Sequence, residues 1–354
     1  MVPSSREILE AASVSLDAAL ELILRPRVDL AALSGVLHVC ALHDAGGADD
    51  APLRNILMGA AAPKSLSDWL VLCSVRARAS VVISSGASVR AEGGRPFEIF
   101  GAPFSDAARA LRARVGIEAR GALLLMTRGE QPLEPDWTIF DDAAGDAGVG
   151  ESAGAGESAG ERAGDSEDEC AGGAARRLDA PVVFRPVLLL PDDATRERVL
   201  ARFASAARAA PLCLTGAELR KGGGCNIDSC GGFEDLSIGT LLSFLRTAAS
   251  GGDESPLLPR CLSADAKHLI SVESGPSVTR QFYESPDCPI DWLMLSTHSG
   301  PICGEALGEA VMRRSAVDCL FERVAMGAAR GDRGNAVDGV DPGVWKFELF
   351  RRKR

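Results

Sequence analysis

The sequence predicts an α/β protein with a mainly parallel sheet, helices on both faces, and an antiparallel hairpin at the C-terminal end. Short apolar runs alternate with amphipathic segments along most of the chain, which is typical of a parallel sheet covered by helices. Residues 316–327 and 343–354 look like two strands that pair with each other. With 354 residues, 46% of them hydrophobic, the chain is long enough to bury one sizeable core or two modest ones.

Residues 1–24 are predicted to form one amphipathic helix in front of a domain that spans 25–354. Its apolar residues recur at helical spacing: Ile8, Leu9, Ala12, Leu16, Ala19, Leu20 and Ile23. Packing on the protein's own core is the usual use of such a face. A membrane surface or a partner helix is the alternative.

Strands and helices are predicted in alternation after this helix, from continuous apolar runs and from apolar residues three or four positions apart. The strands are expected at 25–33, 80–84, 121–127, 182–191, 211–215, 267–273 and 290–300. The helices are expected at 65–79, 105–116 (with Ser105 as its N-cap), 192–210, 234–249 and 275–285.

Residues 141–180 interrupt the domain with a stretch of Gly, Ala, Ser and acidic residues. Eleven acidic residues and three arginines give this stretch a net charge of −8, out of −11 for the whole chain. Such a segment buries too little apolar surface to offset its ordering entropy, so we predict a disordered, solvated insertion. A regulatory or partner-binding segment is the alternative.

The composition argues against several classes of function. An acidic chain without a broad basic face is a poor nucleic-acid binder, and no apolar run approaches the roughly 20 residues that span a bilayer. The acidic N-terminus lacks the pattern of a leader, so a cytoplasmic protein is expected. The ten cysteines are interpreted as reduced thiols. Cys225 and Cys230 have no second cysteine pair nearby, so no metal site is predicted.

Two turns between a predicted strand and a helix could carry chemistry, because ligands bind at the carboxyl ends of parallel strands. In "VVISSGASVRAE" (81–92), small residues and hydroxyls would let a phosphate approach the backbone. In "LISVESGPSV" (269–278), Pro276 suits the first position of a helix, whose free N–H groups attract anions. The simpler interpretation is a capped helix without a ligand. Glu273 ends an apolar strand, where a carboxylate needs partners.

Taken in order, these segments resemble one family, with the likeness running from about Arg25 to Gly304. They are Arg76-Ala77 before "SVVIS", then "SSGASVRAE", then "LISVESGPSV" and "IDWLMLSTHSGPI". The family has Leu-Arg-Ala, a small-residue loop ending in Thr-Val-x-Ala-Asp/Glu, a Val-Glu-Gly-Gly-Pro turn and a Val-Asp-Glu-Leu strand. It is the reductase domain of the riboflavin-biosynthesis deaminase/reductase, which has a dihydrofolate-reductase-like fold.

The resemblance implies an enzyme that uses NADPH to reduce the ribose of a ribosylamino-pyrimidine phosphate to ribityl by hydride transfer. It places Arg76 and Glu273 beside the substrate. It assigns the cofactor to six residues: Ser88, Glu92, Gly275, Pro276, Ser277 and Val278. It names no catalytic residue. It also implies a homodimer, which the sequence itself does not establish.

Departures from the family keep two other functions open. The family's first strand ends in Ser-Leu-Asp-Gly, whereas "ALSGVLHVCALHD" (32–44) stands here. Ser34-Gly35 is one candidate for the remnant of that motif, and His43-Asp44 is the other if the loop is rearranged. The zinc-binding deaminase half is absent from this chain. The first alternative function is a non-catalytic binding or assembly component, and the second is a reductase with a different substrate.

Overall fold

The computed structural model of the chain describes residues 3–46, 50–57, 62–95, 104–117, 121–128, 131–144, 184–209, 211–218, 241–242, 245, 267–284, 288–302, 304–330 and 343–354. Most of the predicted acidic insertion lies outside these residues, as do most of the helix predicted at 234–249 and both Cys225 and Cys230.

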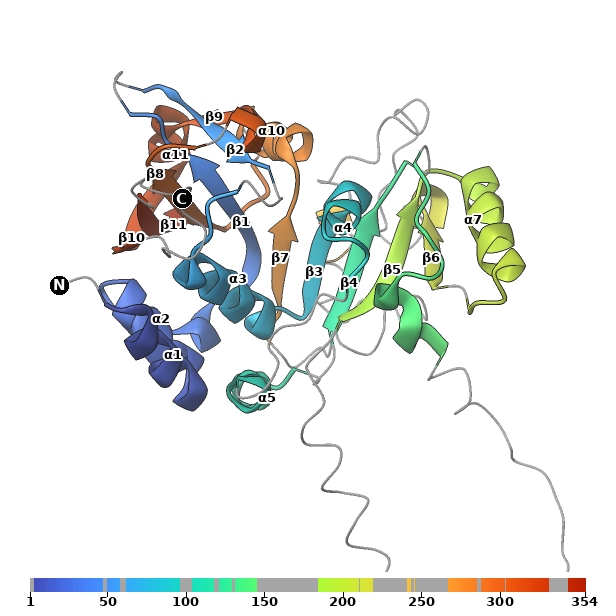
Figure 1. The fold of residues 1–354 in the computed structure, drawn as a ribbon, viewed down its shortest axis with the longest axis horizontal. Coiled ribbons are helices and arrows are strands. Elements are labelled where there is room, and N and C mark those ends of the chain that lie inside the picture. Colours follow the sequence, from blue (N-terminus) through green and yellow to red (C-terminus); the bar gives the residue numbers. More distant parts are fainter. Residues whose placement is uncertain are drawn as a thin grey trace, which may run out of the picture.

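The described strands form one sheet in the order β10-β11-β8-β1-β7-β3-β4-β5-β6, and β2 pairs with both β1 and β9 (Figure 1). From β8 to β6 every neighbouring pair is parallel, whereas β11 is antiparallel to both β8 and β10. The strands are β1 (Gly35–His43), β2 (Pro52–Ile56), β3 (Val81–Ser85), β4 (Gly121–Met126), β5 (Phe184–Leu190), β6 (Leu212–Thr215), β7 (Leu269–Glu273), β8 (Trp292–Ser299), β9 (Leu307–Arg313), β10 (Phe321–Arg330) and β11 (Val344–Arg352).

Helices cover both faces of this sheet. They are α1 (Ser5–Val14), α2 (Leu16–Ile23), α3 (Leu66–Arg78), α4 (Gly86–Ala91), α5 (Ser105–Arg114), α7 (Asp193–Ser205), α10 (Pro276–Glu284) and α11 (Arg314–Leu320), with short 3-10 helices at Leu30–Ala32, Thr138–Ala144 and Gly304–Ala306. The fold class predicted from the sequence is confirmed: a mainly parallel sheet flanked by helices, with an antiparallel hairpin at the C-terminal end. The first strand of that hairpin begins at Phe321, because residues 316–320 of the strand predicted at 316–327 belong to α11.

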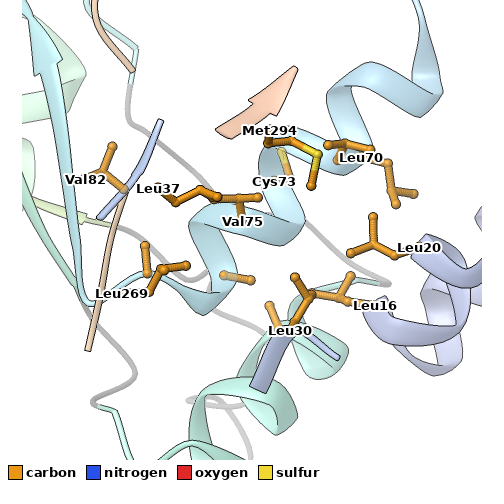
Figure 2. Close-up of a cluster of buried hydrophobic side chains, with 14 of the residues drawn as sticks. Leu16, Leu20, Leu30, Leu37, Leu70, Cys73, Val75, Val82, Leu269 and Met294 are labelled. Carbon is orange, nitrogen blue, oxygen red and sulfur yellow. The ribbon is translucent and has the colours of Figure 1, made fainter. Parts of the chain in front are cut away.

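The core is divided by the sheet into two clusters. In β1, Leu37 belongs to the cluster under α1, α2, α3 and α5, whereas its neighbour Val36 belongs to the cluster under α10 and α11. Alternate residues of a strand point to opposite faces, so a strand covered on both sides is apolar on both sides. Figure 2 shows part of the first cluster, where Leu16 and Leu20 of α2 lie near Leu70 of α3. A fully buried leucine contributes about 1.5–3 kcal/mol.

The N-terminal segment differs from the prediction of one helix over 1–24. It forms α1 and α2, which are separated at Ser15, where φ is −158° and ψ is 134°. A capping box begins α1, because Ser4 accepts a hydrogen bond from Glu7 N and the Glu7 side chain accepts one from Ser4 N. The break at Ser15 starts a new helix, and the apolar residues Leu16, Ala19, Leu20 and Ile23 of that helix are buried.

The strand predicted at 25–33 is also wrong. Asp29 accepts a hydrogen bond from Ala31 N and caps the 3-10 helix Leu30–Ala32, so the chain turns where an extended segment was expected. Arg25 alone makes an isolated antiparallel bridge with Met326. The first strand is β1 instead, followed by β2. Further along, Phe104 and not Ser105 is the N-cap of α5.

Gly35 at the start of β1 needs to be glycine. Its φ is +91°, and an added Cβ would lie 2.4 Å from Oδ2 of Asp291. The same carboxylate oxygen accepts a hydrogen bond from Val36 N at 2.8 Å. A side chain at position 35 would therefore combine backbone strain with displacement of Asp291.

We expect Gly35→Ala to lower the free energy of unfolding by about 3 kcal/mol, because left-handed strain and a lost hydrogen bond add together. Urea unfolding followed by circular dichroism measures the change. Gly304→Ala is the matched control, since a Cβ at Gly304 has no atom within 4 Å. Equal stability of the two variants would contradict this account.

Candidate functional site

The two turns singled out in the sequence lie side by side at the carboxyl edge of the sheet. β3 and β7 are parallel neighbours, and Ser84 of β3 is the register partner of Glu273 of β7. The Ser84 hydroxyl donates to the Glu273 carbonyl oxygen at 3.2 Å. One turn leads into α4 and the other into α10. The structure therefore brings together segments that are far apart in the sequence.

The turn after β3 is held by serine hydroxyls. Ser85 is the N-cap of α4, and its Oγ accepts a hydrogen bond from Ser88 N at 3.1 Å. The two hydroxyl oxygens of Ser85 and Ser88 are also 3.1 Å apart. Glu92 ends the helix as its C-cap. Ser88 and Glu92 thus lie one helical turn apart on α4, beside the end of β4.

The turn after β7 opens α10 as the sequence predicts. Pro276 is its first residue, and the Thr279 N–H makes the first intrahelical bond, to the Gly275 carbonyl at 3.0 Å. The space in front of Gly275 is open, since a Cβ there would have no atom within 4 Å. Val278 packs partly against the core. The Ser277 backbone is helical, and its side chain lies outside what the structure describes.

Arg76 and Glu273 form an ion pair at this edge. Arg76 Nη2 lies 2.6 Å from Glu273 Oε2, and Nε lies 2.9 Å from Oε1. Both side chains are 10% exposed. Burial disfavours the charge of Arg76, but the carboxylate of Glu273 outweighs this, so the pKa of Arg76 is raised. The partner that the Glu273 carboxylate needs is therefore Arg76, which the sequence analysis placed at the site for another reason.

Asp68 is a candidate site residue that the sequence analysis missed. It lies two helical turns before Arg76, so both residues are on one side of α3. Burial raises the pKa of Asp68 to about 6, although a hydrogen bond from the Ser296 side chain of β8 opposes the shift. The spacing of 68 and 76 was visible in the sequence, but the burial and the contact with Ser296 were not. This carboxyl group can hold or release a proton near neutral pH.

The charged groups of this edge act on one another. Burial raises the pKa of Cys73 to about 12; Arg76 opposes this, and Glu273, Asp68 and Glu92 reinforce it. Burial also raises the pKa of Glu92, against the influence of Arg76 and with that of Glu273. The arrangement concentrates carboxylates around α3, with one arginine to balance them.

The carboxyl end of β1 borders the same edge of the sheet. Gly35 begins β1 and pairs with Leu269, so Ser34-Gly35 lies at the opposite end of the strand. His43 is the last residue of β1 and Asp44 follows it, with the Asp44 N–H bonded to the His298 carbonyl at 3.0 Å. His43-Asp44 is therefore the pair at the carboxyl end of β1, beside β8 and β2.

A cleft of about 230 Å³ lies beyond β4, next to the first turn. It is lined by Thr127, Gln131, Pro132, Leu133, Thr195, Arg198, Val199 and Arg202. Arg198 Nη2 donates to Thr195 Oγ1 at 2.8 Å, and Arg202 pairs with Glu134. Arg90 of α4 donates to the Gln131 carbonyl at 3.3 Å, which brings a further cation to the rim. Nothing in the local sequence indicates this cationic cleft.

Two further findings hold for the described part of the chain. No group of three or more His, Cys, Asp or Glu residues in it could hold a metal ion. None of its helices is long and apolar enough to cross a bilayer.

No protein-family profile and no curated protein sequence matches the chain. Among solved structures, it is similar to a pyrimidine reductase-like protein from Corynebacterium diphtheriae (14% identity, TM-score 0.44, covering 91% of this chain and 92% of that one). It is also similar to the riboflavin biosynthesis reductase of Saccharomyces cerevisiae (8%, 0.41, 93% and 93%). A third is dihydrofolate reductase from Enterococcus faecalis, complexed with NADP(H) and RAB-propyl (7%, 0.35, 90% and 97%).

The raised pKa of Asp68 means that folding favours its protonated form. Its contribution to stability is full at a pH below about 4 and is lost as the pH rises through 6. We therefore expect Asp68→Asn to raise the free energy of unfolding relative to wild type by about 2 kcal/mol at pH 8, and by much less at pH 4.5. Urea unfolding across this pH range measures the difference. Glu197→Gln, at an exposed position on α7, is the control. A gain from Asp68→Asn that does not change with pH would contradict the assignment.

Proposed function

We propose that the chain is an NADPH-dependent reductase of a ribosylamino-pyrimidine phosphate, of the riboflavin-biosynthesis type. One observation carries the proposal: the start of α10, a buried Arg76–Glu273 pair and a carboxyl group with a pKa of about 6 lie along one edge of the sheet. A hydride-transfer enzyme needs a place for an anionic cofactor and a proton source beside it.

The residues on the cofactor side fit NADPH. The start of α10 at Gly275, Pro276, Ser277 and Val278 offers backbone N–H groups and a positive dipole end to a diphosphate. Ser88 and Glu92 line the neighbouring turn. The cleft with Arg90, Arg198 and Arg202 suits the extra phosphate that distinguishes NADPH from NADH, because arginine binds phosphate through paired hydrogen bonds. When bound, NADPH supplies the hydride.

The residues on the substrate side hold and protonate the pyrimidine phosphate. Glu273 accepts hydrogen bonds from the substrate while Arg76 holds its carboxylate in place. Arg76 supplies the guanidinium assigned to the substrate's phosphate. Asp68, protonated in part near neutral pH, delivers a proton within the site. Asp44 borders the site from the end of β1.

The alternative is a binding or assembly component without catalysis. The observation that favours it is the Arg76–Glu273 pair itself, because Glu273 already engages two nitrogens of Arg76 and neutralises its charge. A protein of this kind would bind NADPH without turning over a substrate.

We expect NADPH to bind with a Kd in the micromolar range, and more tightly than NADH, because Arg198 contacts the extra phosphate. Arg198→Ala should weaken NADPH binding about tenfold, the loss of one charge-assisted contact, and leave NADH binding unchanged. Calorimetric titration of both cofactors measures this. Arg6→Ala is the control, at an exposed arginine of α1. The cofactor assignment would fail if neither cofactor binds, or if Arg198→Ala affects both alike.

Glu273→Gln separates substrate binding from cofactor binding. The amide keeps the shape of the side chain but leaves Arg76 unpaired, so the turnover of 5-amino-6-(5-phosphoribosylamino)uracil should fall about 100-fold. The Kd for NADPH should change less than twofold. Steady-state rates and calorimetry on the same preparation measure both. An equal loss in turnover and in NADPH affinity would contradict the placement of Glu273 on the substrate side. Absence of turnover by the wild type, with NADPH bound, would favour the binding component.

A further inference from the structure

A buried histidine lies beneath the turn that opens α10. His38 of β1 is completely buried, and its Nε2 lies 3.4 Å from the Thr279 hydroxyl. Thr279 is 2% exposed, and its hydroxyl donates to the Ser274 carbonyl oxygen at 3.2 Å. On the other side of the ring, His38 Nδ1 lies 2.7 Å from the Tyr283 hydroxyl. The network joins β1 and α10 to the turn.

The direction of each hydrogen bond follows from the number of protons available. Burial lowers the pKa of His38 to about 3, so the ring is neutral, with one nitrogen that donates and one that accepts. With the single hydroxyl proton of Thr279 assigned to the Ser274 carbonyl, Nε2 of His38 is the donor to Thr279. Nδ1 is then the acceptor, and Tyr283, whose pKa burial raises, donates its proton to Nδ1.

Thr279 is saturated in this arrangement. A hydroxyl oxygen accepts two hydrogen bonds and donates one. Thr279 Oγ1 accepts from His38 Nε2 and from the Ser274 hydroxyl, which lies 3.2 Å away, and it donates to the Ser274 carbonyl. Its position is therefore fixed from three directions, and the Ser274 carbonyl is fixed with it.

Fixing this carbonyl orients the next N–H group. In a trans peptide the carbonyl of one residue and the N–H of the following residue point in opposite directions. The Ser274 carbonyl points inward to Thr279, so the Gly275 N–H points outward, away from Thr279. Within the described residues, the N–H groups of Gly275, Ser277 and Val278 precede the first intrahelical bond of α10, which Thr279 N makes.

We propose that His38 is a positioning residue that, through Thr279 and the Ser274 carbonyl, aims the Gly275 N–H at the anion held by the start of α10. This inference deepens the proposed function and rests on it for the identity of the anion, the diphosphate of NADPH. His38 touches neither cofactor nor substrate. It acts from inside the sheet, where its imidazole is the one group in this network that joins Tyr283 to Thr279.

Two substitutions at position 38 separate the hydrogen bond to Thr279 from the hydrogen bond to Tyr283. His38→Gln keeps a donor near the place of Nε2 and therefore the bond to Thr279. His38→Asn keeps an acceptor near the place of Nδ1 for Tyr283, but it is too short to reach Thr279. Thr279→Ser and Thr279→Val are the matched pair at the next residue of the network. The first keeps the hydroxyl and the second removes it.

We expect His38→Asn and Thr279→Val to weaken NADPH binding about three- to tenfold, the effect of losing one orienting hydrogen bond. His38→Gln and Thr279→Ser should stay within twofold of wild type. In protein labelled with ¹⁵N-glycine, the Gly275 amide resonance, assigned with Gly275→Ala, should move in the first pair and not in the second. If this network acted in folding alone, the substitutions would lower the melting temperature whether or not they keep the hydrogen bond between positions 38 and 279.

Three results would overturn the proposal. The first is NADPH binding as tight as wild type in His38→Asn and Thr279→Val. The second is an equal loss in His38→Gln and His38→Asn. The third is a Gly275 amide that does not respond to either substitution. If the wild type binds neither NADPH nor inorganic diphosphate, the proposed function fails, and the Gly275 resonance then decides by itself whether His38 positions the turn. If His38→Asn does not fold, the Thr279 pair carries the test.

Discussion

The ion pair between Arg76 and Glu273 is the interaction on which the candidate site depends. The two residues are 197 positions apart in the chain, and the pair fastens the last turns of α3 to the end of β7. Removing one partner of such a buried pair costs about 3–5 kcal/mol, because a charge is left in a poorly solvated place. The cost of breaking the pair falls on these two residues, but the pair also affects the position of the segments next to them. The pair fixes the end of β7, and the end of β7 sets where the turn into α10 begins.

The edge of the sheet around this pair is electrostatically divided. Carboxyl groups gather at α3 and the ends of β7 and α4, where burial raises the pKa of Cys73 and Glu273, Asp68 and Glu92 reinforce the shift. Arginines border the cleft beyond β4, where Arg90 and Arg198 lie near Arg202, which pairs with Glu134. A ligand with a phosphate at one end and an exchangeable proton at the other would lie across this division in one orientation. The distribution of charge along the edge therefore favours one orientation of such a ligand.

The fold class and both turns could be predicted from local sequence, because each depends on residues that are neighbours in the chain. Apolar runs at 81–85 and 269–273 are followed at once by Gly, Ser or Pro, and these patterns have the same meaning wherever they occur. β1 was missed because His38 and His43 interrupt its apolar residues, and their burial depends on partners from α10 and β8. The pairing of Arg76 with Glu273 and the shifted pKa of Asp68 could not be predicted for the same reason. Each is set by contacts between distant segments, and no short stretch of sequence contains both partners.

The position of β1 has a consequence for the order in which the chain becomes ordered. β1 lies between β7 and β8, so the strand formed by residues 35–43 stays without either lateral partner until residues 269–299 have been synthesised. Helices α1 to α3 can collapse early, but the middle of the sheet is completed last, by segments from the C-terminal third of the chain. Pairings across so long a separation are slow to form. In a ribosome-bound fragment that ends before residue 269, only Leu42 and His43 of β1 would have a partner strand, β2, and the exposed edges of the rest of β1 would favour aggregation or chaperone binding.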